Sequence, residues 1–243
     1  MRFLQHYSSS KGNLYEVVAS NGKRLLLDPG VTWKKIQKAL DYDLSNIEAC
    51  FCSHGHITDH AKALKDCINN GIDCYANAET YQACGIEVGV KNYGRNHTIE
   101  DETLVRLSSF YVLAFDVEHD VPSLGFIVYE KATGERLFFA IDTSNITYKF
   151  KYPFSIIAIE CSFDKDILQR RVDKGDIDES AAKRLLVSHL EVQNTKRYLK
   201  EFCDLSKCRE IHLLHCSKGN LDIAKTKAEF EAEFMRPVIV CGE

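Results

Sequence analysis

The sequence is poor in proline and tryptophan and has no long apolar run. Its 243 residues include 4 Pro and 1 Trp. No linker rich in Pro, Gly or Ser, no low-complexity tract and no repeat divides it, which favours one compact domain over residues 1–243 with a substantial core. No stretch approaches membrane-spanning length, and the opening residues MRFLQHYSSS lack an apolar run of signal-peptide length. We therefore expect no membrane partner.

The chain also has no surplus of basic residues. The chain has 31 Lys and Arg against 35 Asp and Glu, a net charge of -4. A protein that grips long nucleic acid usually carries a basic surplus, because phosphate neutralisation supplies most of that affinity. Two local basic clusters, YKFKYPF at 148–154 and Lys196, Arg197 and Lys200, are either solvated surface or, in the first case, a place where bases stack between lysines.

The 10 cysteines include no CxxC pair, which argues against a zinc ribbon. In a chain without a signal peptide they predict reduced thiols and a cytoplasmic location. Most lie in apolar segments, where cysteine usually acts as a small core residue; these are Cys50, Cys67, Cys74, Cys84 and Cys203.

Strands and helices alternate in two similar series. Strands are expected at 2–7, 13–20 and 23–30, with a hairpin at Asn21–Gly22. A helix over 32–42 would bury Trp33, Ile36 and Leu40 on one face. The further elements expected are a buried strand at 47–53, a helix at 59–71, a helical stretch at 163–186, a helix at 191–202, a strand at 210–215, a helix at 221–233 and a final strand. This order predicts an α/β fold of four layers, αβ/βα, with two packed mixed sheets and helices on the outer faces.

The segment CSHGHITDH, residues 52–60, holds three of the nine histidines of the chain. His54 and His56 are two residues apart after a strand, so both side chains leave an extended backbone on the same side. Asp59 and His60 are expected in the first turn of the next helix, where they could face a second ion. A catalytic zinc needs about three protein ligands, so this segment alone is not a complete site.

Polar residues at the ends of other predicted strands supply further candidates. His119 ends the run LAFDVEHD, Asp142 ends LFFAID and His215 ends EIHLLH. Each could be an ordinary turn residue. Their recurrence at strand ends, together with the histidine segment, favours a metal site.

This pattern resembles the metallo-β-lactamase superfamily over nearly the whole chain. Within it, SSSKGN, LLLDPG, SHGHITDHAKAL, ECSFD, SHLEVQN and HCSKGN resemble the YycJ-type branch close to ribonuclease Z. The resemblance implies that one ion, zinc or manganese, is held by His54, His56 and His119, and a second by Asp59, His60 and His215. It further implies that Asp142 bridges the two ions and that Asp28 orients a ligand histidine.

One feature departs from the family pattern. The family motif reads HxHxDH, whereas this chain has one extra residue before Asp59. The extra residue either bulges outward and leaves Asp59 and His60 in place, or weakens the second metal site.

The resemblance implies a metal-dependent hydrolase of phosphodiester bonds, most simply a nuclease. Two ions about 3.5–4 Å apart suit this reaction because they activate a water and neutralise the phosphoryl oxygens. Asp59 and His189, in SHLEVQN, are the candidate catalytic residues, and His189 would give a proton to the leaving group; alternatively it caps a helix.

Several other activities stay open. The acidic balance suits an enzyme that opens small cyclic nucleotides. A single-iron sulfur dioxygenase uses a related ligand set, and a scaffold protein that lost one metal would explain the extra residue. The expected partners are a nucleic acid or nucleotide substrate and, by resemblance, a second copy in a homodimer.

Overall fold

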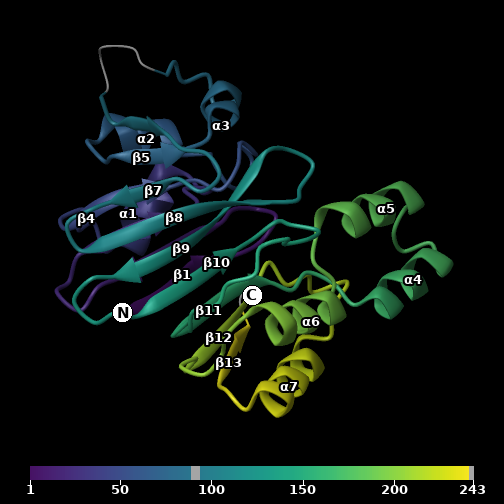
Figure 1. Cartoon of the computed structure of the whole chain (residues 1–243). Coiled ribbons are helices and arrows are strands. Elements are labelled where there is room, and N and C mark those ends of the chain that lie inside the picture. Colours follow the sequence, from purple (N-terminus) through teal and green to yellow (C-terminus); the bar gives the residue numbers. More distant parts are fainter. Residues whose placement is uncertain (89–93, 241–243) are drawn as a thin grey trace. The chain divides into compact units, whose positions relative to one another are not determined.

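The computed structural model describes residues 1–88 and 94–240. The chain divides into two compact units, Met1–Asp116 with Val121–Glu135, and Val117–Asp120 with Arg136–Glu243. Figure 1 labels their elements. The single domain predicted over residues 1–243 stays a prediction. None of the described helices is both long enough and apolar enough to cross a membrane.

The first unit is built on a six-stranded mixed sheet in the order β1-β2-β3-β4-β5-β6. The strands are β1 (Arg2–Tyr7), β2 (Leu14–Val18), β3 (Arg24–Leu27), β4 (Ile47–Phe51), β5 (Cys74–Ala76) and β6 (Asn96–Thr98). The first three pair antiparallel, and β3 to β6 pair in parallel. Gly22 has φ +81 in the expected hairpin between β2 and β3. This unit also contains β7 (Leu104–Arg106), nearly all of β8 (Phe110–Val117), and β9 (Ser123–Glu130).

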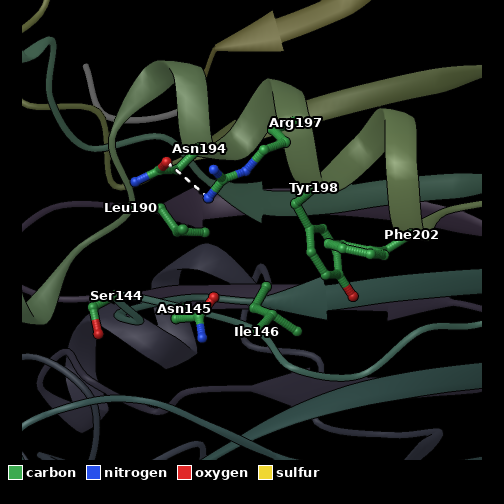
Figure 2. A pocket seen from close by; sticks show the side chains of 8 residues that line it. All are labelled: Ser144, Asn145, Ile146, Leu190, Asn194, Arg197, Tyr198 and Phe202. Carbon is green, nitrogen blue, oxygen red and sulfur yellow. Dashed lines mark hydrogen bonds between the residues drawn. The ribbon is translucent and has the colours of Figure 1, made fainter.

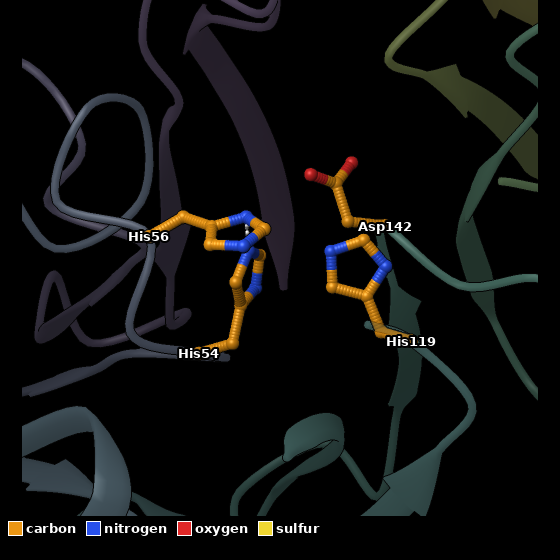
Figure 3. Close-up of side chains that lie close together, drawn as sticks. All are labelled: His54, His56, His119 and Asp142. Carbon is orange, nitrogen blue, oxygen red and sulfur yellow. Dashed lines mark hydrogen bonds between the residues drawn. The ribbon is translucent and has the colours of Figure 1, made fainter. Parts of the chain in front are cut away.

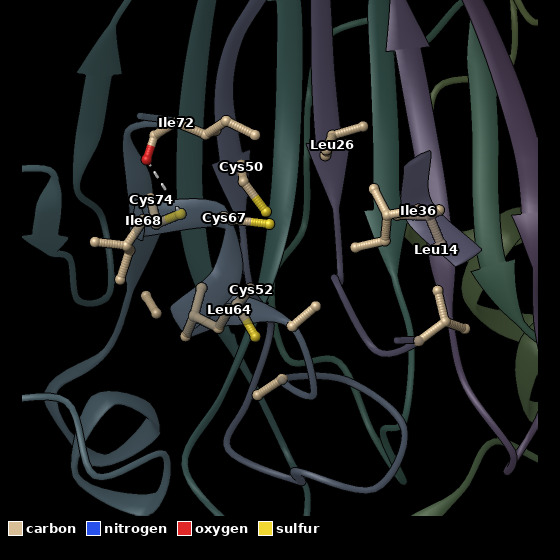
Figure 4. Packing of buried hydrophobic residues seen from close by; sticks show 14 of the residues in the cluster. Leu14, Leu26, Ile36, Cys50, Cys52, Leu64, Cys67, Ile68, Ile72 and Cys74 are labelled. Carbon is tan, nitrogen blue, oxygen red and sulfur yellow. Dashed lines mark hydrogen bonds between the residues drawn. The ribbon is translucent and has the colours of Figure 1, made fainter. Parts of the chain in front are cut away.

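Three helices of the first unit are α1 (Trp33–Ala39), α2 (Leu64–Asn69) and α3 (Ala78–Ala83). Ile36 and Leu40 are buried as expected from their helical spacing, and Trp33 packs against the same core while partly exposed. Figure 4 shows this core, in which Leu14 and Leu26 from the sheet, Ile36 from α1 and Leu64 from α2 all take part. The core therefore forms between the strands and the helices that follow them.

The helix expected over 59–71 is wrong in its first part, because α2 begins only at Leu64. Asp59 and His60 lie in a turn in which the carbonyl of His56 accepts hydrogen bonds from three successive amides, those of Asp59, His60 and Ala61. The amide of Ala63 donates to Pro29 instead of continuing the turn as a helix. Long-range backbone contacts of this kind override the local helical pattern.

The second unit contains four parallel strands in the order β13-β12-β11-β10. They are β10 (Arg136–Ala140), β11 (Ile156–Glu160), β12 (Glu210–Leu214) and β13 (Val238–Val240). All five residues of β11 are buried, as expected for a parallel strand with a neighbour on each side. Because the strands are parallel, the residues after β10, β11 and β12 meet at one edge of the sheet.

The helices of the second unit are α4 (Lys165–Asp173), α5 (Glu179–Ser188), α6 (Val192–Phe202) and α7 (Ile223–Phe234). The single stretch predicted over 163–186 is in fact α4 and α5, separated by Gly175 at φ +73. Asp178 then caps α5, since its carboxylate accepts a hydrogen bond from the amide of Ser180. The prediction of a helix at 191–202 agrees closely with α6.

Nine cysteines lie among the described residues, and all nine are free thiols. Cys50, Cys67 and Cys74 are buried in the core of the first unit, as predicted. Cys84 and Cys203 are only half-buried, so the core assignment is too strong for these two.

Candidate metal centre

The histidine segment of the first unit is a buried loop that begins directly after β4. His54 and His60 are fully buried, and Asp59 is nearly so. The Nε2 of His54 lies 3.0 Å from the Nδ1 of His56, the contact drawn as a dashed line in Figure 3. The two rings meet edge to face with their centroids 4.6 Å apart. His54 and His56 thus gather as their spacing predicts.

Asp28, at the end of the neighbouring strand β3, contacts this loop through both of its carboxylate oxygens. Its Oδ1 accepts a hydrogen bond of 2.7 Å from the amide of Ser53, and its Oδ2 lies 3.1 Å from the Nδ1 of His60. A carboxylate on Nδ1 fixes the tautomer of a neutral imidazole and leaves Nε2 as the atom that can bind a metal. This is the contact expected of a carboxylate that orients a ligand histidine.

Asn13, in the segment SSSKGN, occupies the other side of the His60 ring. Its amide nitrogen lies 2.9 Å from the Nε2 of His60 and donates a bond of 3.1 Å to the carbonyl of Asp59. Because an amide nitrogen can only donate, Nε2 accepts here, so an ion on this atom would have to displace the amide. No role was predicted for Asn13 from the sequence, and its place in the SSSKGN motif was the one signal.

Gly30 lies in the segment after β3, where that segment comes very close to the histidine loop. A Cβ added at Gly30 would lie 1.7 Å from the carbonyl oxygen of Asp59. Any side chain at position 30 would therefore push the Asp59 turn away, which explains the glycine of the LLLDPG motif.

The second unit gathers four further candidates around the edge of its parallel strands. Asp142 follows β10, Glu160 ends β11, His189 precedes α6 and His215 follows β12. One ligand atom from each lies within 4.8 Å of the others. The rings of His189 and His215 stack with centroids 5.2 Å apart. The strand-end candidates Asp142 and His215 therefore lie close together within this unit.

Glu160 is the residue of this cluster that the sequence reasoning missed. Its side chain is fully buried, and its Oε1 lies 2.6 Å from the Nδ1 of His189. Its Oε2 accepts a hydrogen bond of 2.7 Å from the amide of Thr143, the residue next to Asp142. Its position in ECSFD, at the end of an apolar strand like Asp142 and His215, was the signal that could have identified it.

His119 lies close to the same cluster. Its Nδ1 is 3.0 Å from the carbonyl oxygen of Ser188, to which it donates, and its ring centroid is 5.9 Å from that of His189. Burial lowers the pKa of His119, although Asp142 and Asp120 act in the opposite direction. A neutral ring whose Nδ1 donates has its Nε2 lone pair for a metal. Figure 3 includes His119 and Asp142, both from this unit.

Three candidate residues adopt the left-handed backbone conformation that is uncommon outside glycine. The φ angles are +54 at Asp28, +46 at Asp142 and +52 at His215. Each follows the end of a strand, so the chain turns sharply there and directs the side chain at the strand edge. Such conformations cost on the order of 1–3 kcal/mol each and concentrate at functional sites.

The donor sets suit divalent cations. Imidazole and carboxylate ligands favour ions such as zinc, manganese and iron. In the second unit, two carboxylates, Asp142 and Glu160, are 3 % and 0 % exposed beside two imidazoles. Buried carboxylates at such short range need positive charge to offset their desolvation and repulsion. The residues therefore fit a bound cation.

The site residues predicted from the sequence are accordingly distributed over both units. His54, His56, Asp59 and His60 gather in the first, and His119, Asp142, His189 and His215 gather in the second. The joint use of both sets stays a prediction.

His6, His97 and His212 take no part, since their ion-pair neighbours are Glu16, Asp73 and Glu210.

Replacing Glu160 by alanine is expected to lower the free energy of unfolding by about 1–3 kcal/mol. The buried amide of Thr143 would lose its acceptor, and an unsatisfied buried donor costs about this much. Glu160→Gln keeps an oxygen acceptor and the side-chain shape, so its loss should be smaller. Urea unfolding followed by circular dichroism measures both variants, and equal losses would contradict the acceptor role.

No protein-family model matches the chain, and no curated protein matches it. Solved structures do match. The metallo-β-lactamase fold protein YhfI from Bacillus subtilis is 16% identical, with a TM-score of 0.72 over 99% of this chain and 96% of that one. Zinc-bound PqqB from Methylobacterium extorquens is 13% identical, with a TM-score of 0.74 over 100% and 99%. The short form of human tRNase Z is 16% identical, with a TM-score of 0.64 over 100% and 97%.

These matches show the fold. The chain has the metallo-β-lactamase fold, with mixed sheets and, among the described residues, seven helices. This confirms the fold class that the sequence predicts. At these identities the likeness carries the fold alone and leaves the activity to the argument from the site.

Proposed function

We propose that this protein is a metal-dependent hydrolase of phosphodiester bonds, a nuclease of the YycJ type. The observation that supports this most is the pair formed by His189 and Glu160 beside Asp142 and His215. It adds a group that can move a proton to a cluster of metal-type donors. Phosphodiester hydrolysis needs both, since the attacking water must be activated and the leaving alkoxide must be protonated.

Two divalent ions, zinc or manganese, belong to this proposal. By resemblance, His54, His56 and His119 would hold one ion and Asp59, His60 and His215 the other, with Asp142 shared. When bound, such ions lower the pKa of a water and neutralise charge on the phosphoryl oxygens. Asp59 accepts a hydrogen bond of 2.9 Å from the hydroxyl of Thr58, which fixes one carboxylate oxygen.

His189 would act as the proton donor to the leaving group. In the protonated ring, Nδ1 donates to the Oε1 of Glu160 at 2.6 Å and Nε2 carries the proton that can be given away. The negative charge of Glu160 stabilises the imidazolium before transfer, as a buried carboxylate does for a general acid–base histidine. The amide of Leu190 also lies 3.4 Å from the Oε2 of Glu160, so the same carboxylate positions the chain on both sides.

Small cyclic nucleotides are a second candidate substrate class. The net charge of -4 offers little of the phosphate neutralisation that long nucleic acids need. The match to tRNase Z favours a nuclease. The resemblance of the motifs to its branch favours the same activity. The substrate would be a nucleic acid or a nucleotide in either case.

Hydrolysis of bis(p-nitrophenyl) phosphate with added Mn²⁺ or Zn²⁺ tests the reaction class. We expect turnover that chelation removes and either metal restores. Parallel assays with single-stranded DNA, RNA and 2′,3′- and 3′,5′-cyclic nucleotides then identify the substrate. Oxygen uptake with a thiol persulfide and Fe²⁺, in the absence of diester hydrolysis, would instead identify a sulfur dioxygenase.

A further inference from the structure

A small pocket lies in the second unit next to two of its candidate metal-site segments. Its floor is the loop from Ser144 to Ile146, two residues beyond Asp142, and its wall is formed by Leu190 and helix α6. Figure 2 shows Asn194 and Arg197 projecting from α6 over Leu190 toward this loop. Leu190 directly follows His189, so the pocket adjoins both Asp142 and His189 along the chain.

Two polar side chains of the pocket, Arg197 and Asn194, present donors. Arg197 is exposed and donates a hydrogen bond of 3.2 Å from Nη2 to the Oδ1 of Asn194. Because Oδ1 accepts this bond, the amide nitrogen of Asn194 remains a donor. Within residues 1–88 and 94–240 no carboxylate forms an ion pair with Arg197, whereas Lys200, one turn further along α6, pairs with Glu233. The Arg197 charge is thus not neutralised by the protein.

The carboxylate close to the loop is already engaged. Glu118 accepts a bond of 3.0 Å from the side-chain amide of Asn145, and its carbonyl accepts from Ser144 and Thr143. These bonds fix the loop after Asp142, and the side-chain amide of Asn145 engages one oxygen of the Glu118 carboxylate. An anion beside Arg197 would therefore meet a guanidinium and the side-chain amide of Asn194 in one place.

The size of the pocket limits what it admits. Its volume is about 40 Å³. A single water needs roughly 10–15 Å³ on this measure, so the pocket holds a few waters or one tetrahedral oxyanion, and not a nucleobase. The lining also includes the apolar side chain of Leu190, and the charge of Arg197 makes a small oxyanion the group that fits the chemistry.

We propose that this pocket binds a non-scissile phosphate of a nucleotide substrate, with Arg197 as its principal contact and Asn194 as a supporting donor. The proposal rests on the proposed function, since a phosphate is non-scissile only where the enzyme cuts another phosphodiester bond of the same substrate. Arg197 forms paired hydrogen bonds to phosphate oxygens, which an isolated lysine cannot do. The protein therefore prefers substrates that carry a second phosphate.

Three dinucleotides test this preference, TpT, pTpT and TpTp, together with their ribonucleotide counterparts. We expect one of the two phosphorylated forms to have a KM about tenfold lower than the unphosphorylated form, as one charge-assisted contact provides. Arg197→Ala should abolish this difference in KM between the phosphorylated and unphosphorylated forms. Arg197→Lys should retain part of it. Lys200→Ala, which removes one charge from the same helix outside the pocket, should retain all of it.

Calorimetry on the metal-free protein separates this proposal from the proposed reaction. We expect thymidine 3′,5′-bisphosphate to bind more tightly than a thymidine monophosphate, and Arg197→Ala to remove the difference. An Arg197-dependent difference without turnover would overturn the reaction and support the pocket. Turnover with no preference, or a preference that Arg197→Ala leaves intact, would overturn the pocket. Binding of inorganic phosphate that does not compete with the phosphorylated dinucleotide would also overturn it.

Discussion

Replacing His189 by alanine is expected to lower kcat by about 10²- to 10⁴-fold on nucleotide diesters while the metal content stays unchanged. This is the usual contribution of a general acid. Removing His189 takes away the proton donor held by Glu160 but none of the residues proposed to hold the ions. Steady-state kinetics and elemental analysis of the same preparation measure both quantities.

The leaving group distinguishes proton donation from a structural role. The p-nitrophenolate anion is stable without a proton, whereas a nucleoside alkoxide is not. His189→Ala should therefore slow bis(p-nitrophenyl) phosphate hydrolysis much less than dinucleotide hydrolysis. His97→Ala is the matched control, because His97 pairs with Asp73 outside the candidate site. Equal losses on both substrates, or loss of metal from His189→Ala, would mean that His189 supports the site and does not donate the proton.

Replacing His56 by alanine is expected to remove at least one ion per chain and to reduce turnover to the background rate. His56 lies beside His54 and is half-exposed, so its imidazole is placed to bind an ion without supporting the core. The first ion would then keep only two histidines, His54 and His119, beside the Asp142 that it shares with the second ion, so it would be held more weakly. Elemental analysis and the bis(p-nitrophenyl) phosphate assay provide the two readouts.

A variant of His6 provides the comparison for His56. His6 forms an ion pair with Glu16 on the neighbouring strand, and His6→Ala should keep both the metal content and the rate. Thermal unfolding of the metal-free proteins shows whether His56→Ala is folded. A folded His56→Ala variant with full metal content and normal turnover would remove His56 from the proposed ligand set.

Much of the architecture follows from local sequence pattern. Trp33, Ile36 and Leu40 are spaced for one helical face, and all three pack on the first core. Asp142 and His215 end apolar runs that form parallel strands, and parallel strands bring their following residues to one edge. The pattern of apolar strands therefore explains why Asp142 and His215 lie close together.

The remainder depends on contacts that are distant in the sequence. The turn at Asp59 replaces a helical pattern because Asn13, Pro29 and Gly30 engage that segment across the unit. Glu160 reads as an ordinary end to an apolar strand until His189, 29 residues later, lies against it. The sequence marks Glu160 only by its position at the end of an apolar strand and shows neither of these long-range contacts. Sequence reasoning therefore assigned Asp59 to a helix and left Glu160 without a role.

The segment with the extra residue before Asp59 forms this same turn. The Nε2 of His60 accepts the amide of Asn13, so a second ion competes with a hydrogen bond already made inside the protein. The proposed mechanism therefore depends most on whether a second ion binds at His60.

The metal content per chain, measured on protein purified without chelator and correlated with bis(p-nitrophenyl) phosphate turnover during stepwise metal addition, tests the central proposal most directly. We expect turnover to rise with metal and to reach its maximum at about two ions per chain. A folded protein that saturates at one ion or none, with no turnover in Mn²⁺ or Zn²⁺, would contradict the dinuclear phosphodiesterase and leave the histidine loop to another chemistry.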